Sequence, residues 1–119
     1  MIRFFGYDKC STCRTAKKFL QARKVNFEDL DITVSPPPKS LLQSILKSGW
    51  YGLRDLLNRS GEMYRALNMK EKVARLSEDE ILDLLAKHGK LVKRPLISDG
   101  KRHTVGFDEK TLDAVWKQS

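Results

Sequence analysis

The chain has few cysteines, few histidines and no long apolar run, and each shortage excludes a class of protein. Two Cys in 119 residues are too few for a disulfide scaffold. The chain also has only two His. A zinc site built on both cysteines would need His88 and His103, which lack the spacing of zinc ligands. The apolar runs are far shorter than a membrane-spanning helix, and the first residues do not resemble a signal peptide. We therefore expect a cytoplasmic protein that does not associate with membranes.

Size and charge narrow the class further. A chain of 119 residues holds one hydrophobic core, so we expect a single domain. Its 23 Lys and Arg outnumber 15 Asp and Glu, which gives a net charge of +8. The basic residues are spread along the chain, so we expect no direct contact with nucleic acid. A basic but inert surface, an anionic ligand and an acidic protein partner remain open interpretations. No long apolar stripe calls for a second subunit, so we expect a monomer.

The first third of the chain predicts a β-α-β unit. Residues 2–5 form a short apolar run typical of a strand. Ser11 or Thr12 can cap a helix that continues to about Ala22. Residues 25–32 alternate apolar and polar side chains, the pattern of a half-buried strand. Two strands joined through a helix in this way are expected to pair in parallel.

Residues 35–89 predict helices only. Prolines at the start of this stretch suit the first turn of a helix that ends near Gly49. Shorter helices are expected over 53–58 and 62–67. Ser77 and Glu80 form a capping box that opens a helix ending near Gly89. The expected core faces are Leu41, Leu42, Ile45 and Leu46 in the first helix and Ile81, Leu84 and Leu85 in the last.

The last part of the chain predicts a hairpin and a final helix. A strand enters through Pro95 and covers 94–98, a turn follows at Asp99-Gly100, and a return strand covers 102–105. Asp108 can cap the last helix, whose expected buried side carries Leu112, Val115 and Trp116. The whole order resembles a thioredoxin-like α/β fold with a helical insertion. We expect the core to comprise 1–34 and 90–119, and the insertion 35–89.

A pair of thiols is placed where the first strand gives way to the first helix. In the run Cys10-Ser11-Thr12-Cys13, Cys10 precedes the helix and Cys13 lies on the face of its first turn that points to the core. Unpaired N–H groups and the helix dipole stabilise a thiolate at a helix N-terminus. Cys10 is therefore predicted to attack and Cys13 to resolve, with Arg14 adding positive charge. Two buried structural cysteines are the alternative interpretation.

Arg94-Pro95 is the second feature of interest. The proline has two interpretations: simple punctuation before a strand, or a cis-proline opposite the reactive cysteine, as in thioredoxin-like folds. In the second case Arg94 brings a planar, bidentate cation to an anion near Cys10.

Three segments and one insertion pattern resemble the arsenate reductase (ArsC)/Spx family. The segments are Cys10 to Lys18, Lys93-Arg94-Pro95-Leu96-Ile97 and Val105-Gly106-Phe107-Asp108-Glu109, and the insertion pattern is Asn58-Arg59-Ser60-Gly61 followed by Tyr64 and Leu67-Asn68. Together they span essentially the whole chain. The resemblance implies a thioredoxin-like core, a helical insertion and a redox-active cysteine. The spacing of Cys10 and Cys13 at the helix start also predicts that they form a reversible disulfide bond.

The resemblance to the reductases of this family also implies roles for single residues. Cys10 matches the nucleophile, and Arg94 matches the arginine before the proline. Arg59 lies one residue beyond the position of a second anion-binding arginine, which Asn58 occupies, and no arginine stands near 106–107. We expect Arg94, Arg59 and Arg14 to bind an anion and Pro95 to shape the site.

The family resemblance leaves two functions open. The first is a thiol-dependent reductase of a small anionic substrate, with no bound cofactor or metal and with glutathione or a glutaredoxin as electron donor. The second is an Spx-like redox-sensing transcriptional regulator that docks on the α subunit of RNA polymerase.

Overall fold

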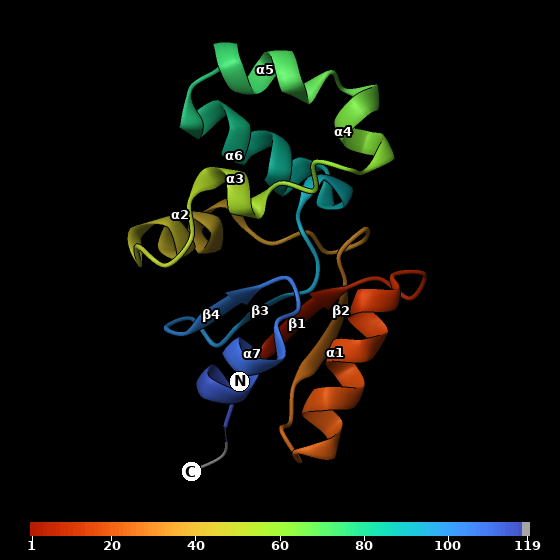
Figure 1. Cartoon of the computed structure of the whole chain (residues 1–119). Coiled ribbons are helices and arrows are strands. Elements are labelled where there is room, and N and C mark those ends of the chain that lie inside the picture. Colours follow the sequence, from red (N-terminus) through yellow and green to blue (C-terminus); the bar gives the residue numbers. More distant parts are fainter. Residues whose placement is uncertain (118–119) are drawn as a thin grey trace.

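A four-stranded mixed sheet forms the centre of the computed structural model, which describes residues 1–117 (Figure 1). The strands are β1 (Arg3–Gly6), β2 (Glu28–Asp31), β3 (Leu96–Ser98) and β4 (His103–Val105). Their order in the sheet is β2-β1-β3-β4. β1 pairs in parallel with β2 and antiparallel with β3, and β3 pairs antiparallel with β4. The expected thioredoxin-like α/β fold is therefore confirmed.

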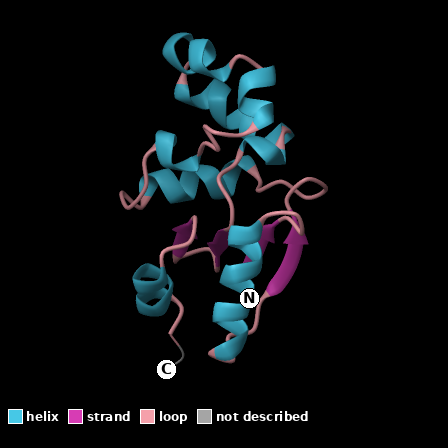
Figure 2. Ribbon diagram, turned by 45° about the vertical axis from the view of Figure 1, so that its right-hand side comes forward, coloured by secondary structure: helices cyan, strands magenta, loops and turns pink. Residues whose placement is uncertain are grey.

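One face of the sheet is covered by helices α1 (Ser11–Ala22) and α7 (Glu109–Val115), which lie together beside the strands (Figure 2). Phe4 of β1 and Ile97 of β3 point into this layer and are fully buried. The helices and the segments next to them contribute Cys13, Ala16, Leu20, Val25, Leu112 and Trp116. The indole N–H of Trp116 donates to the hydroxyl of Thr104 at 2.9 Å, so the burial of this ring leaves no polar atom unpaired.

The other face is covered by the helical insertion, which stands above the sheet in Figure 1. Its elements are α2 (Lys39–Lys47), α3 (Leu53–Leu56), α4 (Glu62–Ala66), α5 (Met69–Arg75), α6 (Glu78–Lys87) and the short 3-10 helix η1 (Gly89–Leu91). Phe5 of β1 and Leu96 of β3 point into this layer. Because neighbouring residues of a strand point to opposite faces, Phe4 and Phe5 of β1 and Leu96 and Ile97 of β3 give these two strands an apolar side chain on each face.

Gly89 marks the place where the insertion returns to the sheet. A Cβ atom at this position would lie 1.8 Å from the carbonyl oxygen of Ile32. Only glycine permits so close an approach of two backbone segments. The insertion is thus held directly against the end of β2.

Several boundaries differ from the sequence predictions. The strand predicted over 25–32 is only β2, an edge strand whose single half-buried side chain is Leu30. The first residue of β3 is Leu96, two residues after the predicted start. Helix α5 was not predicted as a separate element, and α6 buries Leu82 rather than Leu84. The caps at Ser77 and Asp108 are confirmed.

No helix within residues 1–117 has the length and apolar composition that crossing a membrane requires.

Candidate active site

Cys10 itself, rather than Ser11 or Thr12, is the N-cap of α1. Its backbone is extended, and its Sγ accepts a hydrogen bond from the backbone N–H of Cys13 at 3.3 Å. The Cys10 N–H donates to the carbonyl oxygen of Tyr7 at 3.0 Å, which closes the turn before the helix. The half-buried sulfur therefore sits at the positive end of a 12-residue helix, where an N–H group points at it. This geometry suits a thiolate.

Cys13 lies one turn further on and is only 1% exposed. Burial first, and then its hydrogen bond with Cys10, raise the pKa of its thiol to about 12. The Tyr7 backbone and the charge of Arg94 act in the opposite direction. Both thiols are free. Cys13 is therefore a protonated thiol held behind the half-exposed sulfur of Cys10.

Cys10 opens onto a cleft of about 460 Å³, here called the thiol cleft. It is lined by Cys10, Thr12, Asn58, Lys93, Arg94 and residues 105–108. These residues come from the start of α1, the insertion, the segment before β3 and the segment from β4 to α7. The fold thus brings four separate parts of the chain to one thiol.

Arg94 lines the same cleft as Cys10, and its peptide bond to Pro95 is cis, which agrees with the second interpretation of this proline. The Arg94 guanidinium lies 5.8 Å from the centre of the Tyr7 ring, and the Lys90 ammonium lies 5.5 Å from it. One aromatic ring therefore contacts two cations at the edge of the site, which restricts where they can move.

Lys93 also lines the cleft, a position that its sequence motif did not predict. Its side chain passes over Gly106, where an added Cβ would lie 3.1 Å from Lys93 Cε. Gly106 also has a φ of +79° and donates its N–H to the Pro95 carbonyl at 2.9 Å. Gly106 belongs to the motif Val105-Gly106-Phe107-Asp108. The glycine in this motif is the sequence feature that relates to Lys93, because it leaves room for the Lys93 side chain.

Arg59 and Arg14, both predicted to bind an anion, are exposed. Among the residues that the structure describes, neither lines the thiol cleft, and Asn58 stands there beside Arg59. The Arg14 side chain donates to the carbonyl oxygen of Asp8 at 2.6 Å. Their roles in anion binding stay predictions, whereas Arg94 and Lys93 supply positive charge at the cleft itself.

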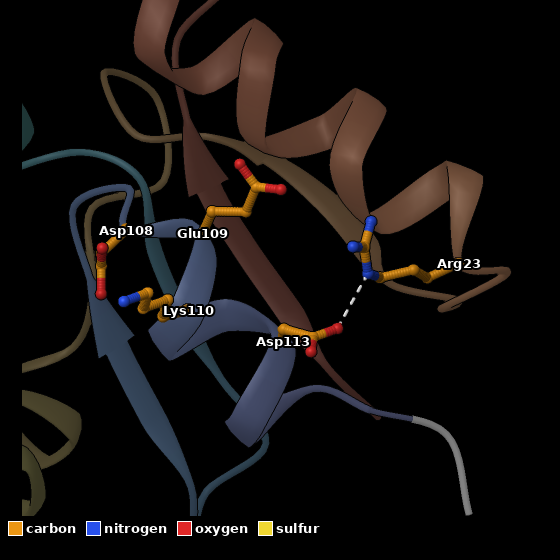
Figure 3. A pocket seen from close by; sticks show the side chains of 5 residues that line it. All are labelled: Arg23, Asp108, Glu109, Lys110 and Asp113. Carbon is orange, nitrogen blue, oxygen red and sulfur yellow. Dashed lines mark hydrogen bonds and ion pairs between the residues drawn. The ribbon is translucent and has the colours of Figure 1, made fainter.

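A second concavity, of about 560 Å³, lies between the end of α1 and α7 (Figure 3). It is lined by Arg23, residues 108–110 and Asp113, and the Arg23 guanidinium pairs with the Asp113 carboxylate at 3.0 Å. Neither cysteine lines it. Within residues 1–117, no group of three or more His, Cys, Asp or Glu side chains is placed to hold a metal ion. Cys10 therefore opens onto the thiol cleft and not onto this concavity.

Comparison with known proteins relates this site to others. Residues 5–115 match the ArsC family. A Bacillus subtilis protein with the name Uncharacterized protein YusI is 43% identical over 115 residues, which cover 97% of this chain and 98% of that protein. The Global transcriptional regulator Spx of Streptococcus pneumoniae is 34% identical over 119 residues, covering 100% of this chain and 88% of Spx. The crystal structure of a possible arsenate reductase from Streptococcus mutans is similar with a TM-score of 0.85 and 39% identity, covering 95% of this chain and 98% of that one.

Proposed function

The chain belongs to the ArsC family, a thiol-based redox family, and on that premise we propose that it is a thiol–disulfide oxidoreductase. Cys10 attacks the substrate and Cys13 resolves the product. One observation carries this proposal: Cys10 Sγ caps α1 at the mouth of the thiol cleft, and the protonated thiol of Cys13 lies buried one turn behind it. Two purely structural cysteines would not need an open cleft in front of one of them.

In the first step the Cys10 thiolate attacks one sulfur of a substrate disulfide. A bond forms between Cys10 Sγ and that sulfur as the substrate S–S bond breaks, and the other half of the substrate leaves as a thiolate that takes up a proton from water. Arg94 and Lys93 line the cleft in which this happens. Their charges favour a substrate with negatively charged groups.

In the second step the Cys13 thiol loses its proton to water and attacks Cys10 Sγ. The second half of the substrate leaves as a thiolate, and a Cys10–Cys13 disulfide remains. The substrate has then gained two electrons and the protein has lost two. Glutathione or a glutaredoxin in the cytoplasm is the proposed donor that returns the protein to the dithiol state.

The surroundings of Cys13 support this order of events. Burial raises its pKa most, and the hydrogen bond with Cys10 and the charge of Cys10 raise it as well. The mixed disulfide on Cys10 removes the last two effects. The Tyr7 backbone and the charge of Arg94, which lower the pKa of Cys13, stay in place. Attack by Cys10 therefore makes Cys13 easier to deprotonate.

Mass spectrometry after reaction with the uncharged probe bis(2-hydroxyethyl) disulfide tests this proposal. The wild type should lose two hydrogens without retaining an adduct, and dithiothreitol should reverse the change. Cys13→Ala should stop as a stable mixed disulfide of Cys10 with 2-mercaptoethanol, and Cys10→Ser should not react at a comparable rate. Fast reaction of Cys10→Ser, or a lasting adduct on the wild type, would contradict the assigned roles.

A redox-sensing regulator is the second candidate. It is supported by the similarity to Spx, a named transcriptional regulator, over the full length of this chain. In this case the Cys10–Cys13 disulfide changes affinity for the α subunit of RNA polymerase, and the protein turns over no substrate. Titration of purified α subunit with the oxidised protein, the reduced protein and Cys10→Ser distinguishes the two candidates. Binding that depends on the disulfide favours the regulator, and equal or absent binding favours the enzyme.

A further inference from the structure

The thiol cleft carries charges of both signs. Lys93 and Arg94 line it from the segment before β3, and Asp108 lines it from the segment before α7. A site for a simple anion gains nothing from a carboxylate, because a carboxylate repels its ligand. The presence of Asp108 therefore indicates a ligand that carries a positive group as well as a negative one.

The carboxylate of Asp108 is fixed and ionised. Its Oδ2 accepts hydrogen bonds from the backbone N–H and the hydroxyl of Thr111. The Thr111 hydroxyl and N–H bonds hold the pKa of Asp108 below its usual value. Both hydrogen bonds that this carboxylate accepts within residues 1–117 end at Oδ2. Oδ1 is left to accept from a ligand.

The size of the cleft also favours a ligand larger than a simple oxyanion. A tetrahedral oxyanion would fill only a small part of about 460 Å³, whereas a small organic molecule suits a cavity of this size. Val105 and Phe107 add apolar side chains to the lining of the cleft. The cleft thus combines two cations, one carboxylate, an apolar strip and a thiol.

From this combination we infer that the substrate is a small disulfide bearing an α-amino-acid group, whose carboxylate binds Arg94 and Lys93 and whose ammonium binds Asp108. The inference rests on the proposed oxidoreductase function and names its substrate class. With cystine as the example, Cys10 takes one half-cystine and releases one cysteine, and Cys13 then releases the second cysteine. The sum is one disulfide reduced to two thiols and one protein dithiol oxidised to a disulfide.

Three symmetrical disulfides of similar size test the inference on the reduced full-length protein. Cystine carries both charged groups, 3,3′-dithiodipropionate carries only carboxylates, and cystamine carries only ammonium groups. The rate of Cys10–Cys13 disulfide formation is divided by the rate of free dithiothreitol with the same compound, which cancels differences in leaving-group acidity. Cystine should exceed dithiodipropionate by about three- to fivefold, the effect of one solvent-exposed ion pair, and should exceed cystamine by at least as much, because its carboxylate meets two cations.

Variants assign the two halves of the recognition. Asp108→Asn should lower the normalised rates of cystine and cystamine by about three- to fivefold and leave dithiodipropionate unchanged or faster. Asparagine caps a helix as well as aspartate does, so this variant keeps α7. Arg94→Gln should slow cystine and dithiodipropionate more than cystamine, because the loss of its charge from the resolving step affects all three compounds alike. Glu109→Gln is the matched control, because Glu109 follows Asp108 in the chain and lines the second concavity (Figure 3) but not the thiol cleft. It should change no ratio.

The outcomes separate this inference from the proposed function. Equal normalised rates for the three disulfides, or an equal effect of Asp108→Asn on all three, would overturn the substrate class and leave the oxidoreductase in place. If the wild type forms no Cys10–Cys13 disulfide with any of the three, or with the uncharged probe, the proposed function itself fails.

Discussion

The buried thiol of Cys13 makes the stability of the fold depend on pH in a specific range. In the unfolded chain this thiol ionises near pH 9, whereas burial first, and then its hydrogen bond with Cys10, raise its pKa in the folded protein to about 12. Below pH 9 both states hold the proton, and this residue contributes no pH dependence. Between pH 9 and 12 unfolding releases one proton. The free energy of unfolding then falls by about 1.4 kcal/mol per pH unit as pH rises.

At pH 10.5, about one and a half units above the pKa of this thiol in the unfolded chain, the free energy of unfolding should have fallen by about 2 kcal/mol because of this one thiol. Urea unfolding at several pH values between 8 and 10.5, at constant ionic strength and with a reductant, measures it. The free energy of unfolding of Cys13→Ala should lack this slope, so its difference from the wild type should shrink by the same amount. Cys10→Ser is the control, because it leaves the burial of Cys13 intact and should keep most of the slope. Parallel pH curves for the wild type and Cys13→Ala would refute the argument.

Three further predictions concern the return of the insertion, the edge of the site and the substrate. Gly89→Ala places a Cβ against the Ile32 carbonyl and should lower the free energy of unfolding by at least about 2 kcal/mol in urea titrations. Gly52→Ala is the control: the atom nearest to its added Cβ is Asp55 Oδ2 at 3.8 Å, and the substitution should cost less than about 1 kcal/mol. Tyr7→Leu removes the ring that contacts Arg94 and Lys90 and should slow reaction with 3,3′-dithiodipropionate about threefold, while Tyr7→Phe should not; equal rates in the two variants would contradict a positioning role. Arsenate should be reduced at close to the rate of Cys10→Ser in an NADPH-coupled assay with glutathione and glutaredoxin. A dianion attacked by a thiolate needs several fixed cations, each worth roughly a hundred- to a thousandfold in rate, and robust turnover dependent on Cys10 would show that two cations suffice.

The order of the strands and helices could be predicted because local signals and topology agree. The capping box at Ser77 and the cap at Asp108 are satisfied within three residues of chain, so no distant contact is needed to specify them. The β-α-β order at the start forces a parallel pair, and the hairpin at Asp99 forces an antiparallel one. These features fix the fold before any packing is known.

The extent of β2 could not be predicted in the same way. Residues 25–32 alternate in sequence, but the alternation reflects burial of Val25 and Ile32 beyond the two ends of the strand. The strand between them lies at the edge of the sheet, and a single residue there, Leu30, is half-buried. Periodicity records which side chains are buried, and it does not record where backbone pairing stops.

Only some of the residues that line the thiol cleft could be predicted from the sequence, because the others are brought there by contacts between distant parts of the chain. Cys10, Arg94 and Lys93 stand in short motifs, but the position of the Lys93 side chain depends on Gly106, thirteen residues further along the chain, on the other side of the hairpin. Asp108 is signalled in the sequence as a helix cap, and its second role follows only from the surface it shares with Cys10. Contacts of this kind depend on register between strands, which a sequence pattern leaves open.

One residue at this site has two tasks, and they can be separated. Cys10 is both the N-cap of α1 and the attacking thiol. Serine is a strongly preferred N-cap, so Cys10→Ser removes the sulfur and retains an acceptor for the N–H of Cys13. Cys13→Ala, in contrast, removes a buried side chain from the core layer between α1 and the sheet and leaves a cavity. Loss of reaction in Cys10→Ser therefore reports the loss of a nucleophile, whereas effects of Cys13→Ala on the resolving step have to be compared at equal folded fraction. The fold requires only a hydrogen-bond acceptor at the start of α1, which serine could also supply. A cysteine at this position is therefore explained by its reactivity and not by the stability of the helix.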